Sequence, residues 1–310
     1  MPLWKQIQMH SFTADQVRLG FIGVGAMGSR LVRRLLEREY QVVVYDLDSN
    51  KAAELASSGA VAVETIQELV DSSDVILSCL TNDSAVKEVY VGRSGVFVRI
   101  QPGKVVLEMS TVAPETSRDI HAQGAKRGVN VMDVAISGSV LAVEQGTIVL
   151  LAGGDAKVFQ AAQPIFDAVA RSYFLMGPWG SGTSMKLVVN TLLGIGMQAV
   201  AEAIALGEAE GLSRKRLLDV LSQTAVIAPA HVGKLARAER NDYSPQFPVA
   251  LMNKDFRLIL DAADSTGLAL PATAAAFKVN SAALKKDPAA DFSSVIRQME
   301  RSVELTVSGK

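Results

Sequence analysis

A short glycine-rich segment near the start of the chain has the residue types and spacing of a dinucleotide-binding loop. Gly23, Gly25 and Gly28 form a G-x-G-x-x-G pattern directly after an apolar stretch. Ala26 and Met27 stand between the last two glycines. Glycines at this spacing allow a tight turn, a close approach of a pyrophosphate to the backbone, and close packing of the helix that follows. The amide groups at the N-terminus of that helix then bind the phosphates.

An acidic residue stands where the adenosine ribose of a dinucleotide needs a hydrogen-bond acceptor. Asp46 ends the second apolar stretch, eighteen residues after Gly28. A carboxylate at this place accepts hydrogen bonds from the ribose hydroxyls and repels a 2′-phosphate, so it favours NAD over NADP. The alternative to a cofactor site is an ordinary tight turn followed by an aspartate that caps the next helix.

A lysine in an apolar helix is the second candidate for chemistry. Lys186 and Asn190 are four residues apart, so they project from the same face of a helix. A helical lysine is usually solvated, but residues 187–201 contain no charge and no histidine, which predicts a buried helix. Burial lowers the pKa of a lysine toward the range useful for proton transfer. Such a lysine can protonate a carbonyl oxygen while a nicotinamide gives hydride, and Asn190 can hold the lysine or the substrate hydroxyl.

The elements that position these residues follow from the hydrophobic pattern. Short β-branched runs alternate with amphipathic stretches, which predicts parallel strands joined by helices. Strands are predicted at residues 17–24, 41–46, 74–80, 104–108, 129–133 and 147–152, with helices after Gly25, Ser49, Glu64, Asp83, Pro114 and Asp155. After a last apolar run the pattern is helical only, at residues 184–210, 213–223, 249–265, 272–284 and 292–303. We therefore expect an α/β chain with a dinucleotide-binding domain over residues 17–180 and a helical domain over residues 181–310.

Composition argues against several other classes of protein. The chain has 310 residues with 31 basic and 32 acidic side chains, so its net charge of −1 offers no overall attraction to nucleic acid or to a membrane surface. The uncharged run of fifteen residues is too short for a membrane span. A single cysteine, Cys79, and three scattered histidines suggest neither a disulfide nor a metal site. We expect a cytoplasmic, metal-free protein whose first sixteen residues form a frayed extension.

Four segments of the chain resemble the β-hydroxyacid dehydrogenases, the family that contains 3-hydroxyisobutyrate dehydrogenase and the glyoxylate/succinic semialdehyde reductases. The segments are residues 20–28, 133–139, 180–190 and 253–258, in the family's order and spacing. The resemblance implies a Rossmann domain with a mostly parallel sheet, a long inter-domain helix and an all-helical C-terminal domain, usually in a homodimer or homotetramer. It also implies an NAD(P)-dependent oxidoreductase that interconverts a small 3-hydroxy or ω-hydroxy acid and its semialdehyde or keto acid.

The resemblance also implies roles for single residues. Lys186 matches the family's catalytic lysine and Asn190 its companion. The residues matched to the substrate are Ser137, Gly138, Ser139, Phe247 and Asp255, and those matched to the cofactor, beside the glycine-rich loop and Asp46, are Leu80, Thr111 and Lys254. Without the resemblance, residues 137–139 would be an ordinary turn after a strand and Phe247 a core residue.

The chain departs from the family pattern at two places that bear on substrate and cofactor. Val140 and Leu141 stand where the succinic semialdehyde branch has basic residues, which indicates a more apolar pocket. A reductase of imines or larger apolar carbonyls on the same scaffold is therefore an alternative, and so is a non-catalytic dinucleotide-binding module, because fold alone does not prove activity. Residues 46–48 read Asp-Leu-Asp where that branch has Asn-Arg-Thr, which again favours NAD over NADP.

Overall fold

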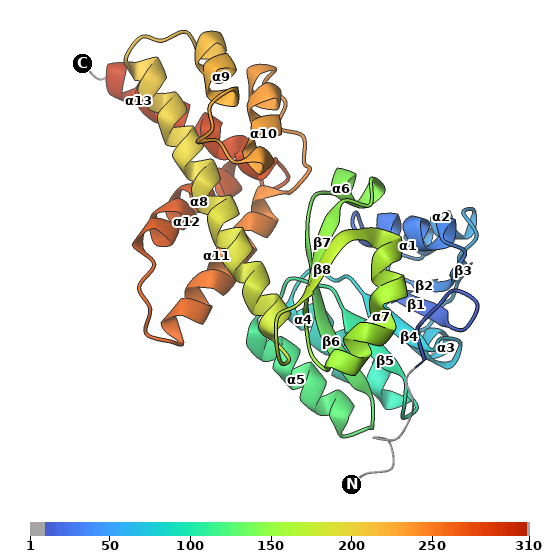
Figure 1. The fold of residues 1–310 in the computed structure, drawn as a ribbon. Helices are drawn as coiled ribbons and strands as arrows, with labels where there is room; N and C mark the ends of the chain where they lie inside the picture. Colours follow the sequence, from blue (N-terminus) through green and yellow to red (C-terminus); the bar gives the residue numbers. More distant parts are fainter. Residues whose placement is uncertain (1–9, 309–310) are drawn as a thin grey trace. The chain divides into compact units, whose positions relative to one another are not determined.

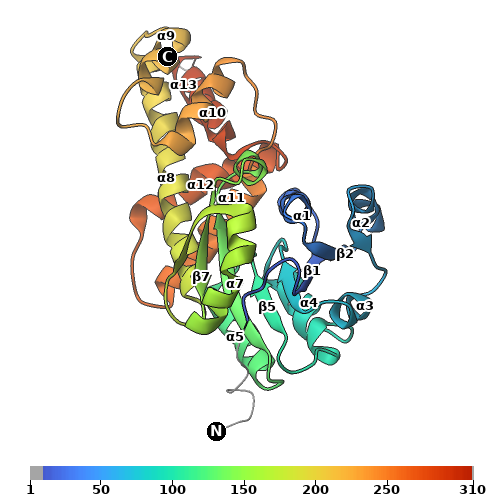
Figure 2. The same cartoon turned by 45° about the vertical axis from the view of Figure 1, so that its right-hand side comes forward.

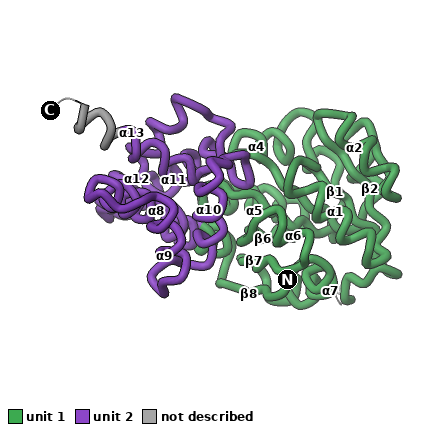
Figure 3. The backbone as a smooth tube through the Cα atoms, turned by 90° about the horizontal axis from the view of Figure 1, so that it is seen from above, with its two compact units in different colours: residues 1–186 green, residues 187–310 purple. Residues whose placement is uncertain are grey.

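The protein folds into two compact units, seen here in a computed structural model that describes residues 10–308 and their side chains as far as residue 301 (Figure 1). Unit 1 comprises residues 1–186 and unit 2 residues 187–310 (Figure 3). The division falls inside one long helix, α8 (Ser181–Ala209), a few residues after the predicted domain boundary at residue 180.

The described residues before the first strand pack against unit 1. Residues 1–9 of the predicted frayed extension lie outside the described residues. The prediction is wrong at Phe12, whose side chain is buried. The Phe12 backbone N–H donates to the carbonyl oxygen of Ala161 at 2.8 Å, and its own carbonyl oxygen accepts the Tyr40 hydroxyl at 2.8 Å. This segment is therefore held against unit 1.

Unit 1 is built around one sheet, which has eight strands within the described residues in the order β3-β2-β1-β4-β5-β6-β7-β8. The strands are β1 (Arg18–Ile22), β2 (Gln41–Tyr45), β3 (Val61–Ala62), β4 (Val75–Ser78), β5 (Val105–Glu108), β6 (Asn130–Ser137), β7 (Ile148–Gly153) and β8 (Ala170–Leu175). Every described pair of neighbours is parallel except β6 and β7. The predicted Rossmann domain with a mostly parallel sheet is confirmed, although β3 was not predicted.

Helices cover both faces of the sheet, and Figure 2 shows β1 and β2 between α1 and α2 on one side and α3 and α4 on the other. The helices are α1 (Gly28–Glu37), α2 (Ser49–Ala56), α3 (Ile66–Asp71), α4 (Asp83–Val91), α5 (Pro114–Ala125), α6 (Val140–Glu144) and α7 (Ala156–Val169), with a 3₁₀ turn at Val96–Val98. Successive strand residues point to opposite faces. Phe21 therefore packs into the core beneath α1, α2 and α7, whereas Ile22 packs into the core beneath α3, α4 and α5.

Strand β6 extends past the edge at which its parallel neighbours end. Glu108, the last residue of β5, pairs with Asp133, and β6 continues to Ser137. The antiparallel strand β7 then runs back until Gly153, its last residue, pairs with Asp133. Strand β8 is parallel to β7 and ends at the same level. The chain therefore returns to the edge where β1, β4 and β5 end, and α8 begins there.

Unit 2 is helical and has its own core. Its helices are the later part of α8, α9 (Arg214–Ser222), α10 (Pro229–Glu239), α11 (Val249–Asp264), α12 (Pro271–Lys286) and α13 (Val295–Ser308), with a 3₁₀ turn at Phe292–Ser294. Met197 and Ile204 of α8 pack in the core with Met252 and Phe256 of α11. The predicted all-helical C-terminal part is confirmed, but α10 was not predicted and the helix predicted from residue 292 begins as the 3₁₀ turn.

Helix α8 is the one described helix that is long and apolar enough to cross a membrane by length and composition alone. A core helix passes the same test, and 44% of the relevant stretch is buried inside the protein. Its buried side also carries the polar side chains of Lys186, Asn190 and Gln198. These features are typical of a helix in a protein core.

Candidate functional site

The glycine-rich loop joins β1 to α1, and each of its three glycines meets a different steric requirement. Gly23 has a φ of +87°, and a Cβ there would lie 2.5 Å from the carbonyl oxygen of Cys79. A Cβ at Gly28 would collide with the carbonyl oxygen of Gly23. At Gly25, in contrast, no described atom lies within 4 Å of the Cβ position. The loop thus combines a tight turn, close helix packing and an approachable backbone, which fits a pyrophosphate.

The N-terminus of α1 is open to an anion. Met27 occupies the N-cap position and makes no side-chain capping hydrogen bond in the described chain, and the first turn contains no acidic residue. The helices α2, α3 and α4 are capped by their own side chains, those of Asp48, Thr65 and Asn82. The amide groups and the positive dipole end of α1 are therefore available to a phosphate.

Asp46 connects the glycine-rich loop to the start of α2. Its Oδ2 accepts the backbone N–H of Val24 at 2.8 Å, and its Oδ1 accepts that of Asp48 at 2.9 Å. Asp48, rather than Asp46, caps α2. A carboxylate has about four lone-pair sites, so the two oxygens of Asp46 retain capacity for ribose hydroxyls.

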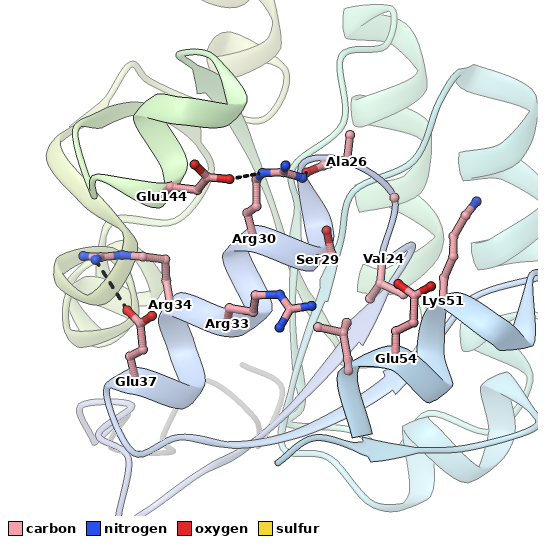
Figure 4. A pocket seen from close by; sticks show the side chains of 12 residues that line it. Val24, Ala26, Ser29, Arg30, Arg33, Arg34, Glu37, Lys51, Glu54 and Glu144 are labelled. Atoms are coloured by element: carbon pink, nitrogen blue, oxygen red, sulfur yellow. Dashed lines mark hydrogen bonds and ion pairs between the residues drawn. The ribbon is translucent and has the colours of Figure 1, made fainter. Parts of the chain in front are cut away.

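A groove of about 470 Å³ begins at this loop (Figure 4). Its walls come from the loop and from α1, α2 and α6, and they carry the charged side chains of Arg30, Arg33, Arg34, Glu37, Lys51, Glu54 and Glu144. Arg30 lies 2.6 Å from Glu144, and Arg34 lies 3.6 Å from Glu37. The groove therefore presents mainly paired charges rather than a field of one sign.

Hydrogen bonds join the loops that follow β4 and β5, where Leu80 and Thr111 were predicted to contact the cofactor. The Leu80 backbone N–H donates to Ser110 Oγ at 2.7 Å, and the Ser110 N–H donates to Glu108 Oε1 at 2.9 Å. Burial raises the pKa of the Glu108 carboxyl to about 7, although its hydrogen bonds from Ser110 act in the opposite direction. This arrangement fixes the loops that contain Leu80 and Thr111.

The predicted substrate loop, residues 137–139, lies at the tip of β6 and leads into α6. Gly138 has a φ of +153°, and a Cβ there would lie 2.7 Å from Cγ2 of Ile148. Ser139 caps α6, since its Oγ accepts the backbone N–H of Ala142 at 3.2 Å. The Ser139 side chain is exposed, and a capping hydroxyl keeps its own hydrogen for donation. Ser137 is half-buried at the end of β6.

Lys186 lies in the second turn of α8 and is 9% exposed, as the uncharged stretch after it predicted. The start of α8 is held by Asp133, whose Oδ1 accepts the backbone N–H of Gly180 and whose Oδ2 accepts that of Thr183, both at 2.8 Å. Sequence reasoning did not single out Asp133, although it lies in one of the four segments that carry the resemblance. Lys186 therefore stands one helical turn beyond an anchored helix start.

In unit 2 the structure brings together Asn190, Lys254 and Asp255. The Asn190 amide nitrogen donates to Asp255 Oδ2 at 2.6 Å, and Lys254 Nζ lies 3.2 Å from Asp255 Oδ1. Asn190 and Asp255 are buried. The side-chain oxygen of Asn190 is buried with no hydrogen-bond partner among the described residues. The amide is thus oriented by the carboxylate and keeps a free acceptor.

Phe247 has the surroundings of a core residue. Its ring packs edge-on against Phe292, with ring centroids 5.7 Å apart, and its backbone N–H donates to Asp291 Oδ2 at 3.0 Å. Its predicted contact with substrate stays a prediction. Among the described residues, no three His, Cys, Asp or Glu side chains come together in a way that could hold a metal ion.

Comparison with known families identifies the class of protein. Residues 18–177 match the model of the NAD binding domain of 6-phosphogluconate dehydrogenase. Residues 180–299 match the model described as NAD-binding of NADP-dependent 3-hydroxyisobutyrate dehydrogenase. The chain belongs to the β-hydroxyacid dehydrogenases, a family of NAD(P)-dependent oxidoreductases.

Individual relatives include two dehydrogenases of hydroxy acids and one protein named as a nuclear factor. NAD-dependent L-serine dehydrogenase from Pseudomonas aeruginosa is 34% identical over 91% of this chain and 97% of its own length. The cytokine-like nuclear factor N-PAC from Anopheles gambiae is 33% identical over 88% of this chain, which spans only 48% of that relative's length. The crystal structure of 3-hydroxyisobutyrate dehydrogenase from Salmonella typhimurium has a TM-score of 0.83 at 26% identity and covers 90% of this chain and 99% of its own. The predicted family, enzyme class and fold are confirmed.

Proposed function

We propose that this protein interconverts a small 3-hydroxy acid, or an ω-hydroxy acid, and the corresponding semialdehyde or keto acid, with NAD favoured over NADP. The observation that carries the proposal is the presence, within unit 1, of an open dinucleotide loop and a buried lysine on a helix that starts at the same sheet edge. The similarity to an L-serine dehydrogenase supports this substrate class, because serine is itself a 3-hydroxy acid.

Proton transfer is assigned to Lys186. A bound nicotinamide supplies hydride to the carbonyl carbon or accepts it from the alcohol carbon. In the reducing direction the Lys186 ammonium donates a proton to the carbonyl oxygen, which becomes the hydroxyl of the product. In the oxidising direction the neutral amine takes that proton back. Because Lys186 is largely shielded from water, the proton passes directly between the lysine and the substrate, and the lysine exchanges its proton with solvent between turnovers.

Two further groups orient the substrate in this proposal. The backbone N–H groups and hydroxyls of residues 137–139 hold the carboxylate, since oriented amides and small hydroxyls bind an anion without an arginine. The free side-chain oxygen of Asn190 accepts a hydrogen bond from the substrate hydroxyl or from the lysine one turn before it. Asp255 fixes which way that amide faces.

The test is a spectrophotometric assay of purified protein at the nicotinamide band, with NAD or NADP and a panel of 3- and 4-hydroxy acids that includes L-serine, 3-hydroxyisobutyrate, glycerate and 4-hydroxybutyrate. The Lys186→Met variant should lose about 10²- to 10⁴-fold in kcat, the usual contribution of a general acid–base group. Lys215→Met, which removes an exposed lysine on α9, is the matched control and should retain parental turnover. A Lys186→Met enzyme within a few-fold of the parent would show that the lysine is not the proton donor.

The same assay tests the cofactor preference. Asp46 holds a negative charge at the end of β2, where it would repel a 2′-phosphate. We expect kcat/KM for NAD to exceed that for NADP. An equal or higher value for NADP would refute the assignment of Asp46 to the ribose.

A second candidate function rests on the apolar residues after the substrate loop. Leu141, at the start of α6, has a 49% exposed side chain, and Val140 beside it is half-buried. These side chains favour a larger apolar carbonyl or an imine. Turnover of cyclic imines, which lack a carboxylate, together with silence on the hydroxy-acid panel would select this candidate. Cofactor binding without turnover of either set would select a non-catalytic module.

We also propose that the chain forms a homo-oligomer. Helix α8 exposes the apolar side chains of Val188, Leu192 and Leu206, of which Leu192 is 72% exposed. Burial of such a row against a second copy would remove it from water. Sedimentation at the mass of a single 32.9 kDa chain would refute the proposal.

A further inference from the structure

We propose that Asp133 is a positioning residue. It anchors the first turn of α8 and thereby sets the position of Lys186 at the sheet edge where β1, β4 and β5 end. The inference rests on the proposed role of Lys186 and extends it to a residue whose side-chain hydrogen bonds go to the start of α8. All the contacts that carry it lie within unit 1.

The first observation is that α8 receives its N-terminal cap from a distant strand. The residue before the helix is Gly180, which has no side chain to accept the first amides. Asp133 takes this place, with its Oδ1 2.8 Å from the Gly180 nitrogen and its Oδ2 2.8 Å from the Thr183 nitrogen. The Thr183 hydroxyl adds a bond to Oδ2 at 3.3 Å. The carboxylate therefore satisfies donors that a helix start otherwise leaves unpaired.

The second observation is the room made for this carboxylate. A Cβ at Gly153 would lie 2.7 and 2.8 Å from the two carboxylate oxygens of Asp133. A Cβ at Gly182 would lie 2.9 Å from Oδ2 and would also collide with the carbonyl oxygen of Leu151. Side chains at these positions would push the carboxylate away from the helix. Asp133 itself is 3% exposed, so water does not compete for its hydrogen bonds.

A hydrogen bond from a second element holds the same turn of α8. The hydroxyls of Ser117 on α5 and Thr183 lie 2.9 Å apart and are both buried. Thr183 is thus held from two sides, by β6 through its amide and by α5 through its hydroxyl. The first turn of α8 is fixed both along the helix axis and around it.

The consequence for Lys186 follows from helix geometry. Lys186 is three residues after Thr183, which places the two on one face of the helix, about 4.5 Å apart along the axis. A shift or rotation of the first turn therefore moves Lys186 by nearly the same amount. A misplacement of about 1 Å in a catalytic group can cost about 10²-fold in rate. Asp133 accordingly affects the rate through the place of the lysine rather than through its own chemistry.

The test uses Asp133→Asn, which keeps the size of the side chain but turns an NH₂ group toward one of the two backbone donors. We expect kcat to fall by about 10- to 100-fold while the KM for NAD stays within about 3-fold. Asp74→Asn is the matched control, because Asp74 also accepts a backbone N–H, that of Arg18 at 2.8 Å, but at the start of β1 and β4. The control should retain parental kcat.

Double variants separate positioning from general stability. If Asp133 acts through Lys186, Asp133→Asn has no further effect on kcat in a Lys186→Met background. Multiplication of the two losses would overturn the inference. Thr183→Val, which removes only the hydroxyl bonds, provides a milder second variant if Asp133→Asn does not fold, and it should lower kcat by an intermediate factor. Parental kcat in a folded Thr183→Val variant would likewise count against the inference.

Amide hydrogen exchange gives a readout that does not depend on turnover. A peptide spanning residues 178–186 should exchange faster in Asp133→Asn than in the parent, whereas peptides from α1 should be unchanged. Unchanged exchange at residues 178–186 would overturn the anchoring. This measurement also separates two failures, because a parent protein that is silent on the hydroxy-acid panel refutes the proposed function but can still show the anchored helix.

Discussion

The buried carboxyl of Glu108 should make the free energy of unfolding of the protein fall as the pH rises from about 5 to 7. Glu108 ends β5, is almost fully buried, and its Oε2 has no hydrogen-bond partner among the described residues. Burial raises the pKa of this carboxyl from 4.5 to about 7. The native protein therefore binds this proton more tightly than the unfolded chain does.

The sign and the size of the effect follow from that difference. Below pH 4.5 the Glu108 carboxyl is protonated in both the native and the unfolded state, and its contribution to the free energy of unfolding is then largest. As the pH rises toward about 7 the unfolded chain loses the proton first, so the free energy of unfolding falls. A displacement of the pKa from 4.5 to about 7 corresponds to about 3 kcal/mol, which is the loss expected above pH 7.

The experiment compares urea unfolding of the parent and of Glu108→Gln between pH 5 and pH 8. The glutamine side chain is neutral at every pH in this range. The free energy of unfolding of the variant minus that of the parent should therefore rise by most of the expected loss of about 3 kcal/mol, and should level off above about pH 7. Glu88→Gln, at an exposed position on α4, is the control and should differ from its parent by no more than about 0.5 kcal/mol at any pH. A Glu108→Gln difference that is constant from pH 5 to pH 8 would refute the reasoning.

Two other substitutions test the loop and the second unit. Gly28→Ala places a methyl group against the carbonyl oxygen of Gly23, so α1 must move. The affinity for NADH, measured by its fluorescence, should therefore weaken at least about 10-fold. An unchanged Kd would contradict this prediction. Lys234→Met removes an ammonium that lies 2.8 Å from the fully buried carboxylate of Asp291, and the uncompensated charge should cost about 3–5 kcal/mol in urea unfolding. The double variant with Asp291→Asn should recover part of that loss, and a single-variant loss below about 1 kcal/mol would contradict the prediction.

Most of the fold could be predicted because its strands are short apolar runs between turns. Two helices escaped prediction for different reasons. Helix α6 has five residues, too few to show a period. Helix α10 buries His231 and Lys234 beside Leu235 and Ala238, so half of its buried face is polar and the apolar repeat is broken. Pro229 at its first position was a usable signal.

The candidate site was predicted residue by residue but not as a set of contacts. The burial of Lys186 followed from the uncharged stretch after it, and the glycine pattern from its spacing. The pairing of Asn190 with Asp255 joins residues 65 positions apart, and no local pattern encodes it. The anchoring of α8 by Asp133 depends on the return of β7 and β8 to the level of β6, which only the strand register reveals.

The long β6 and its return strand also bear on how this scaffold could change over evolution. Residues 138–147 form the tip between β6 and β7 and lie beyond the paired residues of both strands. Length and side chains at this tip can change without shifting the register below it, whereas one residue inserted within β7 would turn every later side chain of that strand to the other face and displace Gly153 from Asp133. With residues 137–139 as the proposed substrate loop, substrate choice would diversify at the tip while the helix that carries Lys186 keeps its place.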